Sequence, residues 1–140
     1  MAAISERSER NLDSVRSSLG DVVRSALRAA PAWMDFVVIS GLRTREEQQA
    51  LWAKGRSELG EVIELEKVVT YRDGVQLKSR HQGGTAVDIV AYKDGSITWD
   101  RKTTAIRAAF IIGYAASRGI RLTGGTKWGW DEGHIELEQE

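Results

Sequence analysis

The chain of 140 residues has no cysteine, one proline, two histidines and no formal net charge. The lack of cysteine excludes a disulfide framework, a thiolate metal site and a cysteine nucleophile. Lys plus Arg and Asp plus Glu number 20 each, so we expect no nucleic acid or anionic lipid partner. No apolar run is long enough to insert into a membrane, and residues 1–7 lack the apolar segment of a secretory signal. The length predicts a single domain, residues 1–140.

Three stretches carry the signals of helices. Apolar residues at spacings of three and four predict a helix from about 6 to 29, which Gly20 weakens without ending. Thr44 and Glu47 form a capping box that predicts the start of a second helix. A third is expected over 100–118, with an apolar stripe that should face a sheet. That stripe consists of Ile106, Ala109, Phe110, Gly113 and Tyr114.

Short β-branched runs predict strands between these helices. We expect a buried strand over 34–39, a hairpin with an Asp-Gly turn over 68–77, and strands over 85–91 and 120–123. The charged segment 56–67 is irregular and is read either as a rim of a groove or as a solvated loop.

The two histidines lie in two compact groups, 79–88 and 131–137. Strand alternation gives His134 and Glu136 a common face, so Asp88 and His134 can meet if the two strands are neighbours. Seven extended steps span roughly 23 Å, so His81 reaches the same site only through a turn. Gly83 and Gly84 provide the backbone freedom for it. Two histidines and a carboxylate suit zinc with one open position, although a buried structural network is the alternative.

At these residues the chain resembles a known family. His-x-x-Gly-x-Ala-x-Asp at 81–88, Asp-x-x-His-x-Glu at 131–136 and Ser-Gly-Leu-Arg-Thr at 40–44 are similar to zinc D,D- and L,D-peptidases that cut peptidoglycan stem peptides. The blocks follow the family's order from about 36 to 137. The resemblance implies an α+β fold, hedgehog/D,D-peptidase-like, in which a small antiparallel sheet carries the zinc site and packs against helices. It implies one Zn²⁺ per chain, with His81, Asp88 and His134 as ligands.

The resemblance also implies catalytic roles. Asp131 aligns with the family's catalytic carboxylate, with Glu132 as the obvious competitor by proximity and Glu136 as the less obvious one. Glu136 is expected to orient a ligand imidazole. Arg43 resembles the arginine that binds substrate and steadies the developing oxyanion, for which a fixed fork of donors is suited. Its alternative role is a surface salt bridge.

Four further residues are candidates for substrate binding, and each has a plain alternative. Gln48 lies one helical turn past Thr44 and is otherwise a surface glutamine. Ser79 either bonds a ligand or caps a turn. Trp128 and Trp130 either wall a substrate groove or anchor the core.

These features predict a zinc metallopeptidase that hydrolyses an amide in peptidoglycan stem peptides. L-alanyl-D-glutamate endopeptidase of the phage endolysin type is preferred on size, the missing signal and the resemblance. D-alanyl-D-alanine carboxypeptidase is the first alternative, and a catalytically silent wall-binding or phage structural module is the second. We expect a monomer, made in the cytoplasm, that reaches bacterial peptidoglycan after holin-type release and acts as a bacteriolytic enzyme there.

Overall fold

One antiparallel sheet organises the molecule. The computed structural model describes residues 4–125 and 131–138, and within them the sheet has five strands. These are β1 (Phe36–Ser40), β2 (Ala86–Lys93), β3 (Ser96–Thr98), β4 (Leu122–Gly124) and β5 (His134–Leu137). The order is β1-β2-β5-β4, and β3 pairs with the distal end of β2. Strand β2 is therefore interior, with β1 as its neighbour on one side and β5 on the other, and β1 and β4 form the edges of this order.

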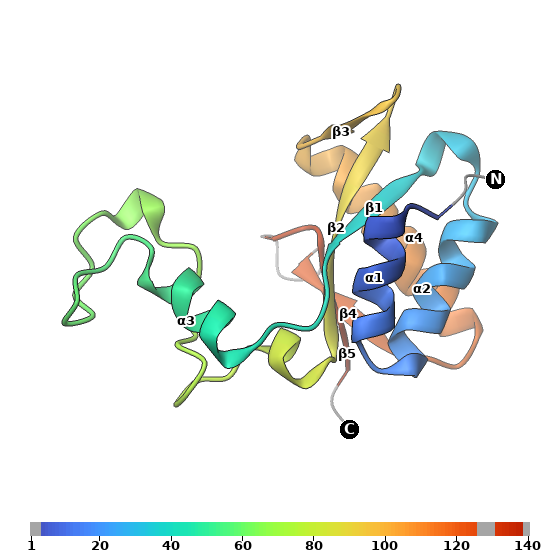
Figure 1. Ribbon diagram of the computed structural model, residues 1–140. Helices are drawn as coiled ribbons and strands as arrows, with labels where there is room; N and C mark the ends of the chain where they lie inside the picture. The colour runs from blue at the N-terminus through green and yellow to red at the C-terminus, as the bar shows by residue number, and fades with distance from the viewer. Residues whose placement is uncertain (1–3, 126–130, 139–140) are drawn as a thin grey trace.

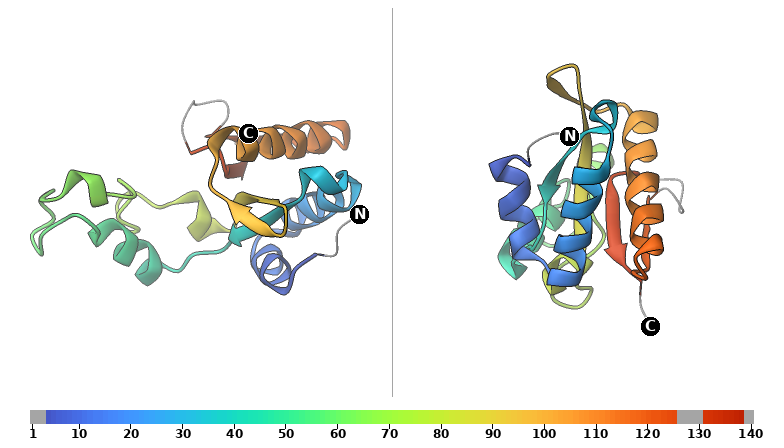
Figure 2. Two further views of the ribbon diagram at one scale, coloured as in Figure 1. Left: turned by 90° about the horizontal axis from the view of Figure 1, so that it is seen from above. Right: turned by 90° about the vertical axis from the view of Figure 1, so that its right-hand side faces the viewer.

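Three helices cover one side of this sheet, and a separate arm projects on the other side (Figures 1 and 2). The helices are α1 (Glu6–Ser14), α2 (Ser17–Ala29) and α4 (Arg101–Ser117). The arm, residues 44–79, contains α3 (Arg45–Ala53) and the 3-10 turn η2 (Leu65–Lys67). Two more 3-10 turns, η1 (Ala32–Met34) and η3 (Arg80–Gly83), precede β1 and β2. The expected α+β fold is confirmed.

The core lies between the helices and the sheet. Leu12 from α1, Leu19 and Val23 from α2, and Ile111 from α4 meet Ile135 of β5, and all are almost fully buried. This burial of apolar surface holds β2 and β5 in place under the helices. No helix in residues 4–125 and 131–138 is long and apolar enough to cross a membrane.

The helix predicted over 6–29 is in fact two helices. The backbone is extended at Val15 and Arg16, where the Arg16 N–H donates to the Gly84 carbonyl at 2.9 Å. Gly20 has a different role from the one predicted. A Cβ at Gly20 would lie 2.5 Å from the Leu12 carbonyl oxygen, so this glycine allows α1 and α2 to approach each other closely.

The hairpin predicted over 68–77 is wrong: these residues, all within the described part of the chain, form no strand. The Asp73 carboxylate accepts hydrogen bonds from the backbone N–H groups of Val75, Gln76 and Leu77 at 2.9 to 3.0 Å. A side chain that takes these donors competes with a strand ladder. A hairpin forms instead between β2 and β3, where Asp94 and Gly95 both have positive φ.

The start of α4 is confirmed, because Asp100 caps it, but the predicted stripe is wrong in part. Ile106 is 52% exposed, and the buried face consists of Thr104, Arg107, Ala108, Ile111 and Ala115. The polar members of that face bond to backbone: Arg107 donates to the Asp35 carbonyl, and Thr104 Oγ1 accepts the Ala91 N–H. A helix face is predicted from its apolar residues alone. The buried face of α4 therefore escaped prediction, because it contains polar side chains that are hydrogen-bonded to backbone groups.

Candidate active site

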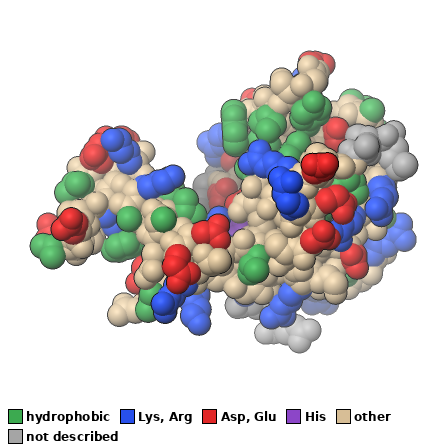
Figure 3. Space-filling model, viewed as in Figure 1, with side chains coloured by type: hydrophobic (Ala, Val, Ile, Leu, Met, Phe, Trp, Pro, Cys, Tyr) green, Lys and Arg blue, Asp and Glu red, His purple; other side chains and the backbone are tan. Residues whose placement is uncertain are grey.

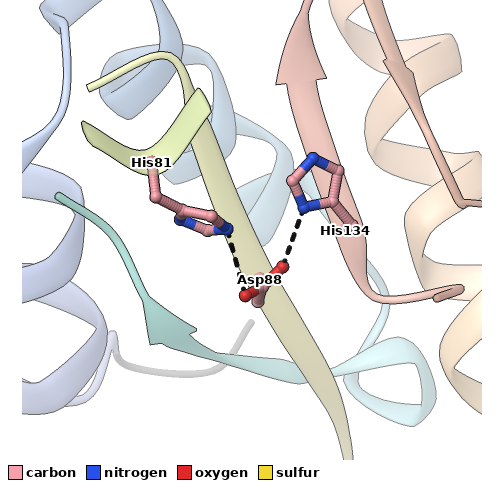
Figure 4. A group of neighbouring side chains, drawn as sticks. All are labelled: His81, Asp88 and His134. Atoms are coloured by element: carbon pink, nitrogen blue, oxygen red, sulfur yellow. Dashed lines mark hydrogen bonds and ion pairs between the residues drawn. The ribbon is translucent and has the colours of Figure 1, made fainter. Parts of the chain in front are cut away.

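The register of β2 and β5 brings the two histidine groups together. Asp88 lies directly opposite His134, which confirms that the two strands are neighbours. His81 lies on η3, which Ser79 caps and Gly84, with φ of 69°, ends. This turn brings His81 back over β2, so that both imidazoles point toward Asp88 (Figure 4). The predicted turn before β2 is thus confirmed.

Asp88 bridges the two imidazoles. Its Oδ2 lies 3.2 Å from Nε2 of His81, and its Oδ1 lies 3.1 Å from Nδ1 of His134. The two rings meet edge to face, with centroids 5.2 Å apart. All three side chains are mostly buried, so water cannot freely screen this group.

In each imidazole, the outer nitrogen, which faces away from Asp88, already has a hydrogen-bond partner. Nδ1 of His81 lies 2.9 Å from the Gly41 carbonyl, and Nε2 of His134 lies 3.0 Å from Oε1 of Glu136. Carbonyl and carboxylate oxygens only accept, so each outer nitrogen must donate. In the neutral tautomers, the inner nitrogens then direct lone pairs at the Asp88 carboxylate. The arrangement requires a cation among these three side chains, either a proton or a metal ion.

The pKa values of the group are consistent with this need for positive charge. Burial opposes ionisation of Asp88, but hydrogen bonds from His134 and His81 outweigh it and hold the pKa of that carboxyl below its usual range. Burial also opposes protonation of His134, yet Asp88 and Glu136 outweigh it and raise the pKa of that imidazole.

The donor set also fits a metal ion geometrically. One ligand atom from each of His81, Asp88 and His134 lies within 4.8 Å of the others. Ligand atoms about 2.0–2.1 Å from a tetrahedral zinc are about 3.3 Å apart, a spacing that lies inside this limit. The three residues could therefore hold a metal ion with one coordination position left for water or substrate.

Arg43 lies next to this group at the end of β1. Its Nη2 is 3.7 Å from Oδ2 of Asp88, and its backbone N–H donates to the His81 carbonyl at 3.0 Å. The side chain is 16% exposed, so Arg43 is no ordinary surface cation. The capping box of Thr44 and Glu47 begins α3 directly after it, as predicted.

Gln48 is fully buried, so the alternative that it is a surface glutamine is wrong. Its Oε1 accepts from Nη1 of Arg43 at 2.7 Å, and its Nε2 donates to the Arg72 carbonyl at 2.7 Å. Gln48 thus joins Arg43 to the arm. This amide supports the guanidinium from behind, and its hydrogen bonds are already used within the protein.

Ser79 has the local role that was its plain alternative. Its hydroxyl accepts the His81 N–H at 3.2 Å, while Gln82 Oε1 accepts the Ser79 N–H at 2.8 Å. This capping box stabilises the turn that carries His81. Trp128 and Trp130, the other two candidates for substrate binding, lie outside the described residues.

The three carboxylates of the second group have different surroundings. Asp131 has φ of 53°, an unusual backbone conformation that Asp tolerates better than most residues. Partial loss of hydration next to the surrounding protein raises the pKa of Asp131, and the negative charge of Asp88 raises it further. The two imidazoles of the site oppose this change. Glu132 is held elsewhere, since its Oε1 accepts from Nε of Arg101 at 3.0 Å. Glu136 bonds to His134, as the strand alternation predicted.

Sequence reasoning missed Arg80. Its Nε lies 3.2 Å from Oε2 of Glu136, and its Nη2 donates to the Leu137 carbonyl at 2.6 Å. The Arg80 guanidinium therefore orients the Glu136 carboxylate, which in turn bonds to His134. An arginine at a variable position of the motif gives no signal of this role, which depends on the side chain of Arg80 reaching from η3 to β5.

The class of protein that this arrangement fits is a metal-dependent hydrolase, with Asp131 and Arg43 beside a ligand set that leaves one position open. A model of the phage L-alanyl-D-glutamate peptidase family matches residues 1–140, and the chain belongs to this family. It is therefore a peptidoglycan peptidase.

Individual relatives agree. The chain is 29% identical to the L-alanyl-D-glutamate peptidase of Escherichia phage T5, over 94% of this chain and 95% of that protein. It is 38% identical to the peptidoglycan L-alanyl-D-glutamate endopeptidase CwlK of Bacillus subtilis, over 61% of this chain and 50% of that protein. The crystal structure of the Serratia marcescens L-Ala D-Glu endopeptidase ChiX is similar, with a TM-score of 0.73 and 31% identity over 96% of this chain and 89% of that one.

Proposed function

We propose that this protein is a zinc-dependent L-alanyl-D-glutamate endopeptidase and that residues 1–140 form its catalytic domain. The observation that carries the proposal is the placement of Asp88 between two imidazole nitrogens, in a chain of this peptidase family. Zinc suits this ligand set because it accepts nitrogen and oxygen donors and tolerates an open fourth position. When bound, zinc would acidify a water molecule and polarise the scissile carbonyl.

The protein's own residues supply the remaining chemistry. Asp131 accepts the proton of the attacking water and passes it to the leaving amine, a role favoured by its raised pKa. Arg43 donates hydrogen bonds to the oxygen on which negative charge develops. Gln48 and Asp88 hold the guanidinium of Arg43 in this orientation.

The D-alanyl-D-alanine carboxypeptidase alternative has less support, because the three relatives described above are all named for L-alanyl-D-glutamate cleavage. A silent wall-binding module would have no need of Asp131 or of the supported Arg43. We further propose that the enzyme is a monomer and that, like a phage lysis enzyme, it reaches the wall after holin-type release.

Digestion of isolated cell walls tests the proposal. We expect new amino termini on glutamate, no release of D-alanine, and loss of both activity and zinc after treatment with a chelator. Free D-alanine would indicate the carboxypeptidase, and wall binding without any new terminus would indicate the silent module. A His81→Ala variant should show neither product nor zinc.

A further inference from the structure

A pocket separate from the candidate active site lies at the far end of the strand that carries Asp88. It has a volume of about 390 Å³, within the range of small-molecule sites, and opens between η1 and the β2–β3 turn. Trp33 and Tyr92 line it together with Asp35, Lys93 and Asp94. Hydrophobic side chains gather over the end of the body where β3 lies (Figure 3).

The buried guanidinium of Arg107 fixes the pocket wall that carries Trp33 and Asp35. Arg107 is only 3% exposed, and its guanidinium donates to the Trp33 carbonyl at 2.7 Å and to the Asp35 carbonyl at 2.6 Å. The Asp35 carbonyl also accepts the Tyr92 N–H at 3.0 Å. Burial of a guanidinium is costly unless it is fully hydrogen-bonded, so the segment that carries Trp33 is rigidly held. Trp33 itself nevertheless remains 67% exposed.

The opposite wall is equally well held. The Tyr92 hydroxyl donates to the Gly95 carbonyl at 3.0 Å, which ties the ring to the turn at Asp94 and Gly95. A Cβ on Gly95 would meet nothing within 4 Å, so the turn leaves the space beside it open. Two aromatic residues are therefore presented on a rigid frame without filling the pocket.

We propose that this pocket binds a sugar of the glycan strand that carries the stem peptide, an inference that rests on the proposed function. The C–H faces of a pyranose pack on aromatic rings, and its hydroxyls donate to carboxylates. Asp35 uses Oδ1 for the Phe36 N–H at 2.9 Å and retains acceptor capacity for such hydroxyls. Because the lining contains one lysine and two acidic residues, the charges are mixed and a neutral polyol is favoured over an ion.

The position of the pocket relative to the candidate active site supports a sugar of the same polymer. Asp88 and Tyr92 are four residues apart on one regular strand, so they share a face and are separated by about 13 Å. The stem peptide joins the glycan through its L-alanine, next to the bond to be cut. One extended residue and its linker span on the order of 7–10 Å, and the next sugar along the glycan extends this span, so that sugar can reach the pocket.

Trp33→Ala tests this inference, with Trp99→Ala as a matched control. Trp99 is also exposed, at 74%, but does not line the pocket. We expect Trp33→Ala to raise KM on glycan-bearing wall fragments about 3- to 10-fold, which is the range for loss of one aromatic contact. Its kcat, and its hydrolysis of the same peptide without sugar, should be unchanged. Trp99→Ala should match the unaltered protein on both substrates.

Direct binding provides a second measurement. Titration of the zinc-loaded protein with a chitin-derived N-acetylglucosamine oligomer should shift the indole N–H signal of Trp33, and not that of Trp99, in NMR spectra. Equal losses on both substrates, equal effects of the two variants, or no shift at Trp33 would overturn the sugar site. Failure of the unaltered protein to cut either substrate would instead contradict the proposed function.

Discussion

Glu136 accepts a hydrogen bond from Nε2 of His134 at 3.0 Å, from two positions further along the same strand. This bond directs the Nδ1 lone pair of His134 at Asp88. The other oxygen of Glu136 lies 3.2 Å from Nε of Arg80, so the carboxylate is itself oriented. A ligand imidazole whose second nitrogen is bonded to a carboxylate has a defined tautomer and greater basicity.

Glu136→Gln should therefore weaken zinc binding by roughly 10- to 100-fold, with a smaller effect on turnover at saturating zinc. Competition with a chromogenic chelator measures the affinity. Glu138→Gln is the matched control, because Glu138 is exposed and bonds through its backbone to Arg121. Equal zinc affinity in the two variants would remove Glu136 from this role.

Each of His81→Ala, Asp88→Ala and His134→Ala should lose the single zinc ion expected per chain. Removal of one ligand leaves two donors, too few to hold zinc against dilution. Metal analysis of the purified variants, with circular dichroism to confirm folding, makes the test. A folded variant that keeps a full equivalent of zinc would show that the altered residue is not a ligand.

Asp131→Asn should abolish most hydrolysis, by about 100- to 10,000-fold, while zinc remains bound. Glu132→Gln is the control on the neighbouring residue, since Glu132 pairs with Arg101 and should matter little. Turnover and zinc content are measured side by side. An inactive Glu132→Gln beside an active Asp131→Asn would reassign the general base.

Arg43→Lys should lower kcat on the order of 100-fold without loss of zinc, because lysine keeps the charge but cannot reach both Gln48 and a developing oxyanion. Arg45→Lys is the control two residues away, with a side chain that is 63% exposed. Kinetics on isolated cell walls decide the matter. If the two variants are equally active, Arg43 has no part in catalysis.

Two helical glycines should respond in opposite ways to alanine. Gly20→Ala should destabilise the fold by about 1–3 kcal/mol, because the new Cβ would meet the Leu12 carbonyl at 2.5 Å. Gly113→Ala should stabilise it by about 0.5–1 kcal/mol, since a Cβ there meets nothing within 4 Å. Denaturant unfolding of both variants provides the comparison. A stabilising Gly20→Ala would show that α1 and α2 are not in close contact there.

Local sequence patterns were sufficient for features that depend on local interactions. The capping box at Thr44, the cap at Asp100 and the turn before β2 all follow from residues within a few positions of one another. Strand alternation was also sufficient to place His134 and Glu136 on one face. The two histidine groups could thus be proposed as one site without any coordinates.

The failures came where another partner took backbone groups that the predicted element would have used, in one case a local side chain and in the other a distant segment. The Asp73 carboxylate replaced a predicted hairpin, and the 6–29 helix broke where Arg16 could bond to Gly84, a residue far away in the chain. Periodicity cannot anticipate such exchanges, because it measures only the apolar side chains of one segment.

What the sequence by itself determined is the chemistry: which side chains can bind a metal ion, take a proton or stabilise an oxyanion, and the local turns that carry them. The tertiary structure alone decided how these groups are oriented. The Gly41 carbonyl and Glu136 set the tautomers of His81 and His134, Arg80 pairs with Glu136, and Gln48 fixes Arg43 from within the arm. Hydrogen bonds depend on distance and angle in space, and only the antiparallel pairing of β2 with β1 and β5 brings these partners within reach.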